Sequence, residues 1–196
     1  MFEGLPGEQC LGYGVLNIDR KSPVAYEWLS SPQLLPLGPS NQLSWAGFTD
    51  EGTPATMDTW GLVQINTRSL WMPLLDTKQH IKGKSDHYFI LGLSEMEKTL
   101  RCILCKGARY PPTLPRPNMS LLDIHLPLCD TNNEKTQQEE ALIMSSMLIQ
   151  LLSTSADQQG SAMIDEAKEK SNRTFKESLM KMFAVIVLHS FIYPIQ

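Results

Sequence analysis

Short apolar runs separated by turn residues dominate the chain up to about residue 130. Their hydrophobic positions alternate or form brief continuous stretches, which is typical of β-strands. The strand candidates cover residues 14–18, 45–48, 55–58, 62–66, 71–75, 88–93, 100–104 and 121–126. Gly52 and Gly61 stand between three of them, where a tight turn with a positive φ favours glycine. The pattern predicts an antiparallel meander.

The spacing of these strands leaves three all-β architectures open, namely a sandwich, a barrel or a set of propeller blades. Residues 45–75 and 88–126 have the length of two successive blades of about 40 residues. A closed propeller typically has about 4 to 8 blades, whereas 130 residues supply about three. If the fold is a propeller, the chain holds only part of it.

The hydrophobic period changes after residue 130 to that of helices. Residues 130–133 offer side chains that cap a helix, and a first helix is predicted from there to about residue 152. A polar loop at 153–161 precedes a second helix, which begins between residues 163 and 168 and ends before Pro194. The expected organisation is a mainly β part with the C-terminal blades of a propeller at 1–130 and the start of a helical bundle at 131–196.

Composition narrows the possible functions of this chain. Of its 196 residues, 42% are hydrophobic, which is enough for a core, and the formal net charge of -4 argues against nucleic-acid binding by bulk charge. The most apolar stretch, 183–192, is well short of the roughly 20 residues that span a bilayer, so no membrane contact is expected. Four cysteines without a secretory signal indicate a reducing compartment.

Tests for catalytic and metal-binding motifs give no positive result. Cys102 and Cys105 have the spacing of half a zinc site, but no second such pair follows, and two buried thiols are the favoured interpretation. The Gly-Lys-Ser sequence at 83–85 lacks the glycine that a phosphate-binding loop needs at position 78, which is Lys78. It predicts a solvated turn held by Ser85 or Asp86. No catalytic residue, metal or cofactor is predicted.

The segment 78–116 differs in charge from its acidic flanks, with eight basic and three acidic residues. Its basic residues interleave with Tyr88, Phe89 and Tyr110, as on a surface that binds nucleic acid. The candidate contacts are Lys82, Lys84, Lys106, Arg109 and Arg116. A solvated rim is the other interpretation and the one that the wide spacing favours.

Five longer strings resemble one known domain in order and spacing. They are Trp45-Ala-Gly-Phe-Thr-Asp-Glu-Gly-Thr-Pro54, Lys82-Gly-Lys-Ser-Asp-His-Tyr88, the stretch 100–117, Leu126-Pro-Leu-Cys129 and Leu179-Met-Lys-Met-Phe183. Over about residues 30–185 the chain is similar to the SepB domain of the WD-repeat and HMG-box DNA-binding proteins. These are the animal relatives of the fungal chromosome-transmission-fidelity replisome adaptor.

The resemblance implies a six-bladed β-propeller followed by a helical bundle, a homotrimer and a nuclear location. It implies a non-enzymatic adaptor that links replicative helicase subunits to DNA polymerase alpha-primase through short helical peptides docked on the bundle. Leu179, Met180, Met182 and Phe183 are the matching candidates for that docking region, although their helical spacing favours plain helix core. A module that binds DNA or chromatin through segment 78–116 is the alternative function.

Overall fold

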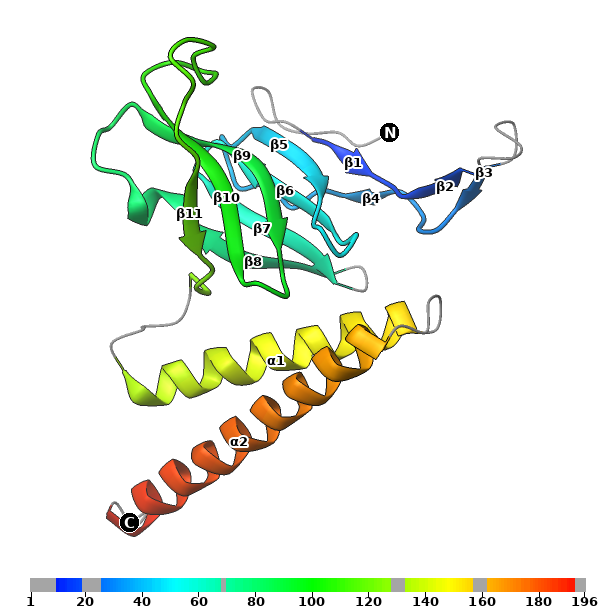
Figure 1. Ribbon diagram of the computed structural model, residues 1–196, viewed down its shortest axis with the longest axis vertical. Coiled ribbons are helices and arrows are strands. Elements are labelled where there is room, and N and C mark those ends of the chain that lie inside the picture. The colour runs from blue at the N-terminus through cyan, green and yellow to red at the C-terminus, as the bar shows by residue number, and fades with distance from the viewer. Residues whose placement is uncertain (1–9, 19–25, 68–69, 128–132, 157–161, 193–196) are drawn as a thin grey trace.

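A computed structural model describes residues 10–18, 26–67, 70–127, 133–156 and 162–192 (Figure 1). Its first strands are β1 (Gly12–Tyr13), β2 (Leu16–Ile18), β3 (Tyr26–Trp28) and β4 (Gln33–Leu34). The central strands are β5 (Leu43–Phe48), β6 (Pro54–Asp58), β7 (Leu62–Thr67) and β8 (Leu70–Asp76). A 3₁₀-helix η1 (Thr77–His80) leads to β9 (Asp86–Ser94), β10 (Thr99–Lys106) and β11 (Ser120–Asp123). Two helices follow, α1 (Glu134–Ala156) and α2 (Ala162–Ile192).

Two antiparallel sheets form the body of the molecule. One has the strand order β5-β6-β7-β8 and the other the order β11-β10-β9, while β1 with β4 and β2 with β3 form two-stranded ribbons. Gly52 and Gly61 have φ values of +88° and +83°, as their turns require. The predicted meander and the fold class, mainly β with C-terminal helices, are confirmed. The two larger sheets are consistent with consecutive propeller blades.

The core lies between these two sheets and continues onto α1. Val63, Ile65 and Leu74 from the first sheet are fully buried, as are Leu93 and Leu100 from the second. The same hydrophobic cluster includes Met144 of α1, and Met147 packs against it. The first helix is therefore an integral part of the β core rather than a separate appendage.

The helices form an antiparallel pair at one end of the sheets. In Figure 1, α1 lies across that end and α2 folds back along the side of α1 that faces away from the sheets. Asn133 caps α1, since its Oδ1 accepts a hydrogen bond of 2.9 Å from the Lys135 amide. The predicted loop at 153–161 begins too early, because Ser153 is still helical and its hydroxyl donates to the Ile149 carbonyl oxygen at 2.7 Å. Residues 157–161 lie outside the described part.

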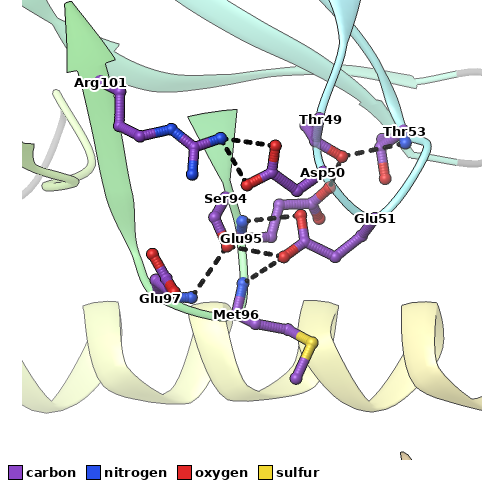
Figure 2. Close-up of polar contacts among 9 residues, drawn as sticks. All are labelled: Thr49, Asp50, Glu51, Thr53, Ser94, Glu95, Met96, Glu97 and Arg101. Carbon is purple, nitrogen blue, oxygen red and sulfur yellow. Dashed lines mark hydrogen bonds and ion pairs between the residues drawn. The ribbon is translucent and has the colours of Figure 1, made fainter. Parts of the chain in front are cut away.

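A polar network joins the two sheets at the end nearest α1, between the β5–β6 and β9–β10 turns (Figure 2). The Glu51 carboxylate accepts hydrogen bonds from the Ser94 hydroxyl at 2.7 Å and from the amides of Glu95 and Met96 at 3.0 and 3.1 Å. The Asp50 amide donates to the Leu93 carbonyl oxygen at 2.8 Å. We call this end of the space between the two sheets, where hydrogen bonds join them, the closed end.

Glu95 is the buried acid of the closed end, with 2% of its surface exposed. Its Oε1 accepts a hydrogen bond of 2.9 Å from the Thr49 hydroxyl. Burial raises the pKa of the Glu95 carboxyl above its usual range, and the nearby charge of Glu51 acts in the same direction. On the surface of this end, Arg101 Nη2 lies 2.6 Å from both carboxylate oxygens of Asp50.

Candidate binding surfaces

The opposite end of the gap opens into a cleft of about 630 Å³ between the two large sheets. We call it the open-end cleft. One wall comes from residues 42–45, 57–59 and 61, and the other from residues 84–90 together with 107, 109 and 110. Thr77, Lys78 and Ile81 complete the lining. The two walls are distant in sequence, and the packing of the sheets brings them together.

The predicted basic residues divide into three groups in the structure. Lys84 and Arg109 line the open-end cleft, together with Lys78. Lys82 and Lys106 are exposed and do not line the cleft. Lys106 is nevertheless close to it, because it pairs with the lining residue Asp86 in the β9–β10 register. Arg116 is exposed in the segment between β10 and β11 and does not line the cleft. The fold thus brings part of the basic segment to one place, while its contact with nucleic acid stays a prediction.

Two carboxylates in the cleft lining are bonded to groups of their own chain. Asp58 Oδ2 accepts a hydrogen bond of 2.6 Å from the Asn41 amide nitrogen Nδ2, and its Oδ1 accepts one of 2.9 Å from the Leu62 backbone amide. Asp86 Oδ2 accepts a hydrogen bond of 3.0 Å from the Gly83 amide, which confirms the predicted turn. These bonds hold both carboxylates in fixed positions.

Aromatic side chains line the cleft beside the cations. The Tyr88 hydroxyl donates to the His80 carbonyl oxygen at 3.2 Å, and burial raises the pKa of Tyr88. The rings of Phe89 and Tyr110 meet edge to face with centroids 6.4 Å apart. The Arg109 guanidinium lies over the Tyr110 ring, 5.6 Å from its centroid. Such a cation–π contact positions the guanidinium at the mouth of the cleft.

The two cysteines of the predicted pair are buried thiols, as favoured. Cys102 and Cys105 of β10 are 0% and 2% exposed. Burial raises the pKa of the Cys102 thiol to about 11, so it is protonated at neutral pH and a poor nucleophile. Among the described residues, no group of three or more His, Cys, Asp or Glu side chains is placed to hold a metal ion. Cys129 lies outside those residues.

The candidate docking residues lie on α2. Leu179, Met180 and Phe183 are 37%, 71% and 59% exposed, so they are not helix core in this structure, whereas Met182 is half-buried. Ser178, on the preceding position, is buried. We call Leu179, Met180 and Phe183 the α2 apolar patch. No helix in the described ranges is long and apolar enough to cross a membrane.

Consecutive antiparallel sheets followed by a helical pair, with two candidate binding surfaces, define the class of this protein as a sheet-and-helix module. The chain matches the family described as minichromosome loss protein, Mcl1, middle region, over residues 2–128, and it belongs to that family. The match begins well before residue 30, so it is wider at the amino terminus than the resemblance indicated.

The chain is similar to particular chromosome proteins. It is 40% identical over 188 residues to WD repeat and HMG-box DNA-binding protein 1 of Xenopus laevis and 39% identical over 185 residues to the Homo sapiens protein of that name. Each alignment covers 93% of this chain and 16% of the relative. Minichromosome loss protein 1 of Schizosaccharomyces pombe is 28% identical over 160 residues, covering 76% of this chain and 19% of the relative. The chain thus spans less than a fifth of these relatives.

The sequence pattern did not predict most of the residues that line the open-end cleft. Trp45, Met57 and Thr59 contribute to its wall, yet no periodicity in the sequence places them opposite residues 84–90. The available signal was the turn at residues 82–86, which puts charged residues at the start of a strand. Only the contact between the two sheets shows which other residues face them.

Proposed function

We propose that this chain is a segment of a non-enzymatic replisome adaptor that works by protein contact in the nucleus. Such an adaptor links replicative helicase subunits to DNA polymerase alpha-primase. Membership of the minichromosome loss family and the chromosome-related names of the relatives support a role on chromosomes. The observation that carries the proposal is the exposure of the α2 apolar patch.

The spacing of the patch suits a helical peptide. Residues 179 and 183 are one helical turn apart, and residue 180 lies beside them, so the three side chains form a short stripe along α2. An amphipathic helix docks through apolar anchors with the same one-turn spacing. Burying three such side chains on binding is favourable by about 25 cal/mol per Å² of apolar surface.

The α2 apolar patch lies on a helix that is packed against the rest of the fold. α2 packs along α1, and α1 shares the core of the β-sheets through Met144. The Glu140 carboxylate of α1 accepts a hydrogen bond of 2.7 Å from the Leu126 amide, next to the end of the β region. A platform that is ordered before binding loses little entropy when a peptide docks.

Self-association belongs to the same proposal. The apolar surface left open on the sheets includes Leu70 and Leu121, which are 74% and 61% exposed. Exposed apolar residues on edge strands favour contact with another chain. A homotrimer of the adaptor would cover such positions.

Peptide binding by the full chain tests the proposal. Fluorescence anisotropy would measure the affinity of labelled helical peptides from helicase subunits and from DNA polymerase alpha. We expect Met180→Ala with Phe183→Ala to weaken binding roughly tenfold or more, because apolar anchors dominate such interfaces. The matched control is Glu166→Ala with Lys170→Ala, two exposed positions on the same helix that lie more than two turns before the patch. Equal affinities for wild type and both variants would refute docking at this patch.

A further inference from the structure

The open-end cleft is a binding site separate from the α2 apolar patch. It lies at the end of the sheets opposite to α1, and its lining contains no residue from either helix. Its volume of about 630 Å³ is within the range of about 300–1,000 Å³ that is typical of ligand sites. A cavity of this size accommodates a few bulky side chains, and a nucleic-acid duplex is too wide for it.

The three basic side chains that line the cleft favour an anionic ligand. Lys78, Lys84 and Arg109 line it, and all three are exposed. The carboxylates of Asp58 and Asp86, which also belong to the lining, are held by hydrogen bonds to Asn41 and to backbone amides. Within the described residues, the ion pairs involve Arg101, His125 and Lys135 and none of these three cations.

The interior of the cleft is suited to an apolar anchor. Met57 and Ile90 are buried residues of its lining, and Trp45 is half-buried there. Cations at the mouth and apolar groups inside are complementary to a ligand that has an apolar centre and acidic flanks. Arg109, held over Tyr110, is already placed for a carboxylate.

The geometry points to a short acidic peptide of a partner protein as the ligand of the open-end cleft, with one apolar or aromatic side chain inserted between the sheets. Its carboxylates pair with Lys78, Lys84 and Arg109. Single-stranded DNA fits less well, because sequence-tolerant binding needs exposed rings on which successive bases stack. Tyr88 is buried and its hydroxyl is bonded, and Tyr110, 63% exposed, is the one aromatic ring classed as exposed among the described lining residues.

The test uses the full chain and a labelled peptide whose central phenylalanine is flanked on both sides by aspartates. We expect saturable binding in fluorescence anisotropy, weakened about tenfold or more by Lys84→Glu with Arg109→Glu, because the reversed charges repel the ligand. The control is Arg116→Glu with Lys176→Glu, which has the same net charge at exposed positions outside the cleft and should bind like wild type. Circular dichroism would check folding, and Lys84→Ala with Arg109→Ala would replace a variant that does not fold.

Three results would overturn the inference. The first is no binding of the peptide by wild type, and the second is an equal loss in the control pair. The third is tighter binding of a thymidine oligonucleotide than of the peptide, with the same dependence on Lys84 and Arg109. A peptide in which serine replaces the phenylalanine should bind clearly more weakly, since it lacks the apolar anchor. The helical-peptide assay on Met180 and Phe183 is independent, so the two proposals can fail separately.

Discussion

The two ends of the gap between the large sheets use charge in opposite ways. At the closed end, Glu51 and Asp50 accept hydrogen bonds from groups of the neighbouring sheet, and those bonds connect the β5–β6 turn to that sheet. At the open end, Lys84 and Arg109 line a cleft, while the nearby carboxylates of Asp58 and Asp86 are bonded to Asn41 and to backbone amides. Charge therefore holds the sheets together at one end and stays available to a ligand at the other.

This difference fits the position of α1. The helix lies across the closed end (Figure 1), and its residue Met144 belongs to the hydrophobic core. Polar groups removed from water need partners, which explains why the closed end is a dense hydrogen-bond network. The open end is distant from the helices, so solvent reaches its cations and they need no protein partner.

The largest effect is expected from Glu51→Ala at the closed end. The substitution removes one carboxylate that accepts three hydrogen bonds and leaves the amide of the buried residue Glu95 without its partner. We expect the free energy of unfolding to fall by about 2–4 kcal/mol, because charged acceptors are strong and buried donors are costly to leave unpaired. Urea denaturation would measure the change.

Glu97→Ala is the matched control for Glu51. Glu97 lies in the same β9–β10 turn, and its side chain is exposed. Its loss should change the free energy of unfolding by less than about 0.5 kcal/mol, as for most surface substitutions. Similar losses in both variants would mean that the network at the closed end does not couple the sheets.

Glu95→Gln should have a smaller effect of opposite sign. Burial raises the folded-state pKa of Glu95 above its ordinary value of 4.5, so the folded chain holds this proton more tightly than the unfolded chain does. As the pH rises above 4.5, the unfolded state ionises first and the wild type loses stability until the folded-state pKa is passed. A glutamine at position 95 keeps an acceptor for the Thr49 hydroxyl. Because glutamine does not ionise, the variant does not lose this stability as the pH rises.

The measurement is the free energy of unfolding of both proteins across that pH range. At neutral pH, Glu95→Gln should be more stable than wild type by up to about 1 kcal/mol, the size of a typical stabilising substitution. At a pH below 4.5 the difference should shrink, because Glu95 is then neutral in both states. A variant that is less stable than wild type at neutral pH would show that the ionised carboxylate is needed.

Local periodicity predicted the strands whose neighbours in the sheet are also neighbours in sequence. β5 to β8 follow each other through short turns, and Gly52 and Gly61 mark two of those turns. β11 is shorter than the apolar run at 121–126, since Ile124 leaves the strand and its amide bonds the Lys98 carbonyl oxygen. Ile124 and Leu126 of that run are buried, but Leu121 is 61% exposed, and the strand ends at Asp123 because its partner β10 begins at Thr99.

Helical periodicity predicted α1 and α2 but not what covers them. A repeat of apolar residues identifies a face, whereas the packing partner decides which part of that face is buried. Ser145 of α1 and Ser178 of α2 are buried, whereas Leu179 and Phe183 of α2 are exposed, although all four lie in helices with apolar repeats. Likewise the basic segment was visible in the sequence, whereas the cleft depends on the packing of two sheets.

The smallest effect is expected from the ion pair on the surface of the closed end. Arg101 and Asp50 join the two sheets, but their side chains are 33% and 45% exposed. Exposed ion pairs contribute at most about 1 kcal/mol, and salt screens them. In a double-mutant cycle of Asp50→Asn and Arg101→Gln, we therefore expect a coupling energy well below the loss in Glu51→Ala, and a further decrease at high salt.

Gly92→Ala probes the same pair without removing either charge. A Cβ at position 92 would lie 2.5 Å from Arg101 Nη2, so the guanidinium that bonds Asp50 has to shift. Because the end of the Arg101 side chain is flexible, we expect the free energy of unfolding to change by less than about 1 kcal/mol, close to the coupling energy of the cycle. A loss as large as that of Glu51→Ala would make the surface ion pair, rather than the Glu51 hydrogen bonds, the main link between the sheets.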